Sequence, residues 1–119
     1  MRVADTLAAF DWLSHEPRFT ALPAIALGMS MGSTMESWTA ALEPRIAACV
    51  DLCCLAEFDA LVAAGADDLH GEYFFVPGLR KQFAAAAINA LVAPRPHLSC
   101  IGAADPLTPL PGVASLAAA

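Results

Sequence analysis

The run from Ile46 to Leu55 constrains the fold most strongly, because Asp51 is its only charged residue. A strand with one face in water would alternate apolar and polar residues, so this run predicts a parallel strand buried on both faces. A buried helix is the alternative that the pattern leaves open. Two shorter runs, Leu22–Leu27 and His97–Ile101, are predicted as further strands.

Segments with helical spacing alternate with these strands. Val3, Leu7 and Phe10 recur on one face of the first segment, which is the spacing of an amphipathic helix. Predicted helices cover residues 3–15, 33–43, 56–65 and 79–92, a last one begins near residue 111, and residues 66–78 are irregular. Alternating strands and helices indicate a parallel sheet, so the fold class is α/β, with about three parallel strands flanked by helices.

Composition excludes several classes of protein. The net charge is −6, which argues against nucleic acid and against anionic membrane surfaces as partners. Hydrophobic residues make up 58% and charged residues 15%, which excludes a disordered chain. The longest uncharged stretch, residues 19–35, is shorter than a membrane span and contains proline and glycine. Asp5 and Asp11 interrupt the region where a signal peptide would be apolar, so no membrane segment is expected.

The cysteines suggest a compartment. Cys49, Cys53, Cys54 and Cys100 lie in apolar runs, unlike the cysteines of small disulfide-rich secreted domains. We expect them to be buried, reduced side chains in a cytoplasmic protein. Zinc is not expected, because the chain has neither a CxxC pair nor a histidine at ligand spacing from the cysteines.

The sequence Gly28-Met29-Ser30-Met31-Gly32 fits the G-x-S-x-G pattern, in which a serine sits on a sharp turn between a strand and a helix. Such a turn forces strained backbone angles on the serine, and the flanking glycines avoid collisions of a Cβ atom. The N–H groups of the following helix favour developing negative charge. The pattern therefore predicts a nucleophilic Ser30, with the Met31 backbone N–H donating to an oxyanion.

Asp105 is the candidate acid partner. It follows the third predicted strand, so it lies at the carboxyl edge of the sheet, where Ser30 is also expected and where functional groups of open α/β sheets gather. Taken alone, an aspartate in Gly102-Ala103-Ala104-Asp105-Pro106 also fits a turn or an N-cap.

From about residue 2 to residue 113 the chain resembles the C-terminal half of an α/β-hydrolase, closest to the dienelactone hydrolase, acetyl xylan esterase and prolyl-oligopeptidase-like branch. The resemblance is carried by the 28–32 elbow, the Cys53-Cys54-Leu55 strand end, residues 67–79, Ala93-Pro94-Arg95-Pro96 and Asp105-Pro106-Leu107-Thr108-Pro109. It implies that Ser30 is the nucleophile, Asp105 the triad acid and Met31 the oxyanion donor. It also implies one partial domain over 1–119, with the elbow at 28–32, a lid-like insert at about 56–92 and an acid loop at 102–109.

The base is where the sequence departs from this family. The expected order is Ser, Asp, His, and no histidine follows Asp105. His97 opens the strand that leads to Asp105, which puts it roughly 26 Å away at about 3.3 Å per residue. His15 precedes the elbow strand and has the same problem. His70 can approach the site, although a structural role or a place in the substrate pocket fits it better.

We therefore expect a serine hydrolase that acts on small ester or amide substrates in the parent fold, in a truncated and weakly active or inactive form here. No cofactor and no metal are expected, and Asp67, Asp68, His70 and Glu72 fit a solvated loop better than a metal site. The alternative is a non-catalytic, degenerate hydrolase module that associates with a second copy or with a completing chain.

Overall fold

The computed structural model describes residues 2–53 and 55–118; Cys54 and the side chains of Arg2 and Tyr73 lie outside this description. The helices are α1 (Arg2–His15), α2 (Met31–Leu42), α3 (Phe58–Ala63), α4 (Ala85–Asn89) and α5 (Leu110–Ala117). The strands are β1 (Ala24–Met29), β2 (Ile46–Leu52) and β3 (His97–Cys100). Single 3₁₀ turns cover Asp67–Leu69, Glu72–Phe74, Leu79–Lys81 and Ala90–Val92.

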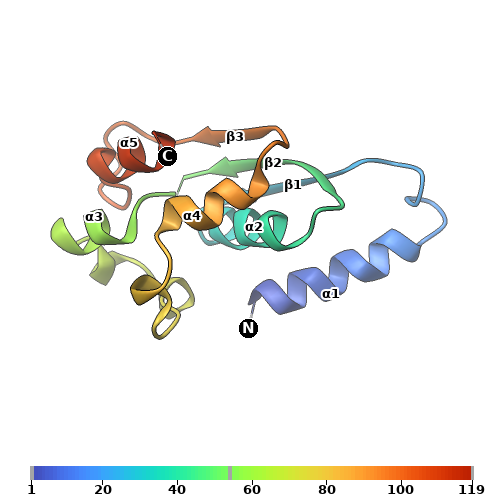
Figure 1. Ribbon diagram of the computed structural model, residues 1–119, viewed down its shortest axis with the longest axis horizontal. Helices are drawn as coiled ribbons and strands as arrows, with labels where there is room; N and C mark the ends of the chain where they lie inside the picture. Colours follow the sequence, from blue (N-terminus) through green and yellow to red (C-terminus); the bar gives the residue numbers. More distant parts are fainter. Residues whose placement is uncertain (1, 54, 119) are drawn as a thin grey trace.

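The three strands form one parallel sheet in the order β1-β2-β3, so the predicted α/β class is confirmed. The run from Ile46 is a central strand, not a helix, and both of its neighbours pair with it. Figure 1 shows α1, α2 and α4 gathered on one side of the sheet, with α3 and α5 beyond the ends of the strands.

The two faces of the sheet differ in cover. Register pairs Ala26 with Cys49 and Gly28 with Asp51, and these residues face α2 and are largely buried. Leu27 and Met29 point to the opposite face, where they are 68% and 67% exposed. Within the described residues, no helix covers this second face, so the sheet is buried on one side only. The prediction that the Ile46 run is buried on both faces is therefore wrong, because only α2 and its neighbours pack on the sheet.

Two small apolar clusters make up the core. One joins α2, β2 and the turn before β3, and consists of Ala40, Ile46, Cys49 and Val92. The other lies under the segment after β2, and consists of Ala56, Leu61, Ala66 and Phe74. Phe74 meets Phe58 edge to face, with ring centroids 5.6 Å apart. Phe74 is therefore part of this core, whereas its neighbour Phe75 is exposed.

The continuous helix predicted over 79–92 is wrong. The segment forms a 3₁₀ turn, then α4, then a second 3₁₀ turn. Ala84 is extended, and the Glu57 carboxylate accepts hydrogen bonds from the N–H groups of Ala85 and Ala86 at 3.1 and 2.7 Å. This long-range cap restarts the helix at Ala85, and so tertiary contacts override the helical preference of alanine.

Arg95 ties three elements together. Its guanidinium donates to Ala40 O at 2.7 Å and Glu43 O at 3.0 Å, at the end of α2, and to Ile46 O at 2.9 Å, at the start of β2. It also donates to Leu91 O and Val92 O in the turn before β3. Carbonyls at a helix end have no partner within the helix, so one charged side chain satisfies several of them.

The cysteines are not uniformly buried, contrary to expectation. Cys49 is buried, Cys53 is partly exposed and Cys100 is exposed on the uncovered face, and all three are free thiols.

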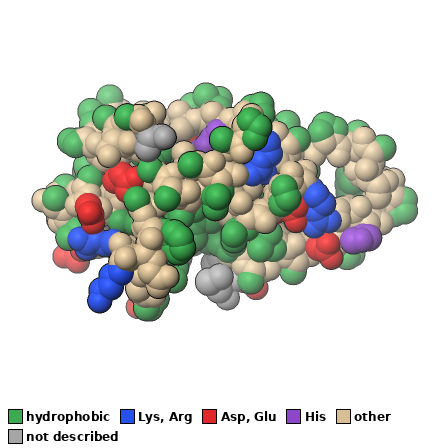
Figure 2. Space-filling model, viewed as in Figure 1, with side chains coloured by type: hydrophobic (Ala, Val, Ile, Leu, Met, Phe, Trp, Pro, Cys, Tyr) green, Lys and Arg blue, Asp and Glu red, His purple; other side chains and the backbone are tan. Residues whose placement is uncertain are grey.

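In Figure 2 hydrophobic side chains are spread across the visible face, with Lys and Arg scattered among them rather than gathered in a patch. No helix in residues 2–53 and 55–118 has the length and apolar character of a membrane span.

Candidate active site

Ser30 sits on a sharp turn between β1 and α2, as the motif predicts. Its backbone angles are φ 55° and ψ −120°, a conformation that residues other than glycine rarely adopt and that costs about 1–3 kcal/mol. The Ser30 N–H donates to Leu52 O at 2.9 Å, which fixes the turn to the end of β2. The residue itself is exposed, so the strained turn presents the hydroxyl at the surface.

The two glycines of the motif have unequal roles. A Cβ atom on Gly28 would lie 2.1 Å from the carbonyl oxygen of Gly32, so the turn closes only with glycine at position 28. A Cβ atom on Gly32 would meet no described atom within 4 Å. The expected steric need for glycine therefore holds at Gly28 and not at Gly32.

Met31 is the first residue of α2. The carbonyl of Ser30 accepts from the N–H groups of Ser33 at 2.9 Å and Thr34 at 3.3 Å, so the helix begins directly after the serine. The first N–H groups of a helix have no partner within it. The Met31 N–H therefore has no partner within α2, and it lies beside the serine at a helix N-terminus, which favours an anion.

Asp105 holds its own loop. Its carboxylate accepts from the Leu107 N–H at 2.9 Å and from the hydroxyl of Thr108 at 3.1 Å. Thr108 is buried, so this turn is anchored in the protein. These contacts are those of the turn-forming aspartate that the sequence left open as an alternative.

His70 lies against the same loop. Its Nε2 atom is 2.8 Å from Leu107 O, and its ring stacks on Phe74 with centroids 4.7 Å apart. His70 therefore lies at the acid loop, but one of its ring nitrogens is hydrogen-bonded to a backbone carbonyl. The other histidines bond elsewhere: His15 Nδ1 lies 2.7 Å from Asp11 O, and His97 Nε2 lies 2.7 Å from the Asp51 carboxylate.

A buried polar cluster beneath the elbow was missed by sequence reasoning. Asp51, Glu36 and Cys49 lie between the sheet and α2, and all are more than nine-tenths buried. Burial, and then the negative charge of Asp51, raise the pKa of Glu36 to about 8, against a smaller lowering by the Cys49 thiol. Burial also raises the pKa of Asp51, opposed by its hydrogen bonds with Ser99 and His97.

The Cys49 thiol responds to the same surroundings. Burial, and then the charges of Glu36 and Asp51, raise its pKa to about 12, so it is not a nucleophile at neutral pH. The only sequence signal for the cluster was Asp51, a single charge in an apolar strand. Glu36 and His97 come from other segments, and only the register of the strands and the position of α2 join them.

Comparison with known proteins gives one informative relative. Over 113 residues, or 95% of this chain, the sequence is 44% identical to a protein of Bacillus subtilis (strain 168) named "Putative hydrolase YtaP". The matched region is 38% of that protein, so the chain spans about two fifths of the length of this relative. No protein-family model and no solved structure matches the chain.

Proposed function

We propose that the chain carries the nucleophile elbow and the acid loop of a serine hydrolase of the dienelactone hydrolase type. The observation that carries this proposal is the strained backbone of Ser30 at a strand-to-helix turn. Strain of this kind is retained where the surrounding structure and function require it. The name of the Bacillus subtilis relative supports hydrolysis as the class of reaction.

The roles follow from the chemistry of acyl transfer. Ser30 Oγ attacks the carbonyl carbon of a small ester or amide while a base takes its proton. The Met31 N–H, at the N-terminus of α2, stabilises the oxyanion that forms. Asp105 orients the base through its carboxylate, whose loop hydrogen bonds hold it in a fixed position. None of these steps needs a cofactor or a metal.

The base is the component that this chain does not provide in the expected order. His70 reaches the acid loop, but its Nε2 atom bonds Leu107 O. We propose that the base and a second oxyanion donor come from outside these 119 residues, since the relative is much longer than the matched region. The chain alone then has weak or no turnover, because loss of a triad member removes most of the rate.

Chemical rescue tests this division of roles. The chain is incubated with a fluorophosphonate probe, with and without imidazole in solution, and modification is read by intact mass and peptide mapping. We expect imidazole to act as the absent base and to accelerate labelling of Ser30. The Ser30→Ala variant should not be labelled under either condition.

Ser115→Ala is the matched control, because Ser115 is an exposed serine on the regular helix α5. Its labelling should equal that of the unmodified chain. Equal labelling of the unmodified chain and of Ser30→Ala, with imidazole present, would refute the nucleophile assignment.

A second candidate is a non-catalytic hydrolase-like module that works by association with a second copy or a completing chain. The exposed apolar residues Ile25, Leu27, Met29 and Leu98 on one face of the sheet favour it. Light scattering distinguishes the two candidates: a monodisperse monomer with Ser30-dependent labelling supports the enzyme. A stable oligomer without such labelling supports the module.

The free thiols at Cys49, Cys53 and Cys100 fit a cytoplasmic location for either candidate.

A further inference from the structure

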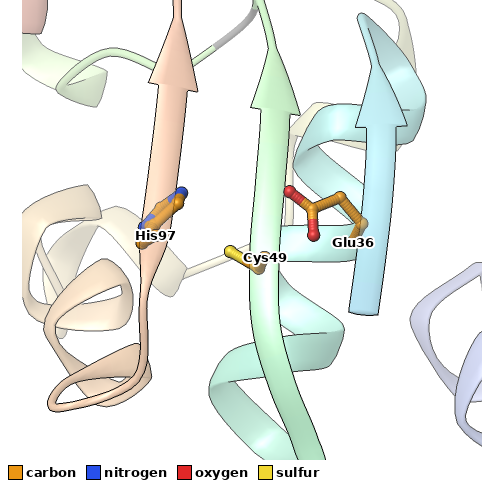
Figure 3. A group of neighbouring side chains, drawn as sticks. All are labelled: Glu36, Cys49 and His97. Atoms are coloured by element: carbon orange, nitrogen blue, oxygen red, sulfur yellow. The ribbon is translucent and has the colours of Figure 1, made fainter. Parts of the chain in front are cut away.

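Three metal-ligating side chains from three separate elements converge beneath the elbow. Figure 3 shows Glu36 on α2, Cys49 on β2 and His97 on β3 turned toward one another. One ligand atom from each lies within 4.8 Å of the other two. Ligand bonds of about 2.0–2.3 Å to zinc put neighbouring ligand atoms roughly 3–4 Å apart, so small side-chain movements suffice to close a site.

The burial of the Glu36 carboxylate also points to a bound ligand. The residue is 6% exposed, and neither carboxylate oxygen makes a hydrogen bond. A buried polar group without a partner costs about 1–3 kcal/mol, and more when it is charged. The carboxylate is directed into the cluster toward Cys49, where a cation would bind one of its oxygens.

Asp51 provides the outer support that metal-binding histidines commonly have. Its carboxylate bonds His97 Nε2 at 2.7 Å and the hydroxyl of Ser99 at 2.9 Å, and it is completely buried. An imidazole has two ring nitrogens, so it can bind a metal through one while a carboxylate holds the other. Asp51 thus fixes the ring of His97 as a carboxylate fixes the histidine of a zinc site.

We propose that Glu36, Cys49 and His97 bind a zinc ion, with Asp51 as the residue that positions His97. Thiolate and imidazole ligands select zinc over calcium or magnesium, which prefer sites made of oxygen. On binding, Zn²⁺ displaces the thiol proton of Cys49 and the carboxyl proton of Glu36, so the total charge of the cluster is unchanged. Water completes a tetrahedral site, and the His97 side chain, which is 15% exposed, marks the route from solvent.

The ion would brace the elbow from below. Its ligands join α2, β2 and β3, and the α2 ligand lies six residues, or about 1.7 helical turns, after Ser30. A bound metal stabilises the folded chain by its binding free energy. The proposal is independent of the serine chemistry, since none of the three ligands takes part in it.

Cobalt titration of the full 119-residue chain tests the site, because Co²⁺ replaces Zn²⁺ and reports its ligands by absorption. We expect one equivalent of Co²⁺ to produce a thiolate-to-cobalt charge-transfer band, and one equivalent of Zn²⁺ to abolish it and to raise the unfolding temperature. Cys49→Ser should remove the band. Asp51→Asn should keep the band and weaken Co²⁺ binding about 10–100-fold.

Cys100→Ser is the matched control, because Cys100 is an exposed free thiol on the uncovered face. It should leave the band and the affinity unchanged. Glu36→Gln keeps the side-chain size and serves if Cys49→Ser fails to fold, as judged by circular dichroism; it should lower the affinity at least tenfold. Absence of stoichiometric Co²⁺ binding, or binding lost in Cys100→Ser but kept in Cys49→Ser, overturns the proposal.

Discussion

The two faces of the sheet differ in the residues they carry and in whether a helix packs on them. The face against α2 carries Cys49, Asp51 and His97, and it is closely packed. The other face carries Leu27 and Met29, and it is exposed. The buried side therefore combines polar residues with an apolar cluster, whereas Leu27 and Met29 make the exposed side apolar.

This difference shows that the position of α2, and not hydropathy alone, decides which residues of the sheet are buried. On the α2 side some buried polar groups have partners, as in the His97–Asp51–Ser99 chain of hydrogen bonds, and others, such as Glu36, have none. On the other side the apolar residues account for part of the 58% hydrophobic composition without contributing to a core. A sheet of this composition fits cover on both faces.

The largest loss of stability is expected between β1 and α2, where Gly28 and Gly32 are in close contact. Gly28→Ala would place a Cβ atom 2.1 Å from Gly32 O, so β1 and α2 must separate. We expect a loss of about 3 kcal/mol or more in the free energy of unfolding. Urea denaturation followed by circular dichroism measures it.

Gly32→Ala is the control for this prediction. Position 32 is helical and a Cβ atom there meets no described atom within 4 Å, so stability should stay equal or rise by about 0.5–1 kcal/mol. Similar losses in both variants would show that glycine is needed for a reason other than the collision, and would weaken the contrast between the crowded and the open sides.

A smaller loss of stability is expected on removing Arg95, the side chain that binds the carbonyls at the end of α2. Arg95→Met keeps most of the side-chain length but removes the hydrogen bonds to Ala40, Glu43 and Ile46. We expect a loss of about 2–3 kcal/mol, because several carbonyls lose a charged donor. The urea midpoint measures it, and Arg80→Met, which removes an exposed ion pair with Asp59, should change stability by less than about 1 kcal/mol.

The smallest effect is expected on the uncovered face. Ile25→Thr in β1 changes a side chain that is 62% exposed, and we expect a change within about 0.5 kcal/mol in the isolated chain. Ile46→Thr makes the same substitution in β2 where the residue is 3% exposed, and should cost about 2 kcal/mol. Equal costs at the two positions would mean that the outer face is covered in solution, by a second copy or another chain.

Much of the fold could be predicted because it depends on local patterns. The apolar run from Ile46 and the alternation of strands with helices predicted the parallel sheet, which is confirmed. The G-x-S-x-G pattern predicted a strained serine, and Ser30 has the expected backbone. The helix predicted over 56–65 is α3 (Phe58–Ala63), and Gly65 follows it with φ 63°.

What could not be predicted depends on contacts between distant residues. The break in the 79–92 segment follows from a carboxylate at Glu57, which no local preference reveals. The Glu36–Cys49–His97 cluster requires the register of β2 with β3 and the position of α2 over both. The roles of Ser30, Met31 and Asp105 in catalysis remain predictions, since local shape alone does not demonstrate a reaction.

The contacts that sustain the strained serine all lie within β1, α2 and β2. The Ser30 N–H is fixed to Leu52 O, and Gly28 is fitted against Gly32, so the contacts described for this turn come from neighbouring residues of β1, α2 and β2. The conformation of the elbow therefore depends on contacts within one strand–helix–strand unit. We expect substitutions outside β1, α2 and β2 to leave the backbone angles of Ser30 unchanged.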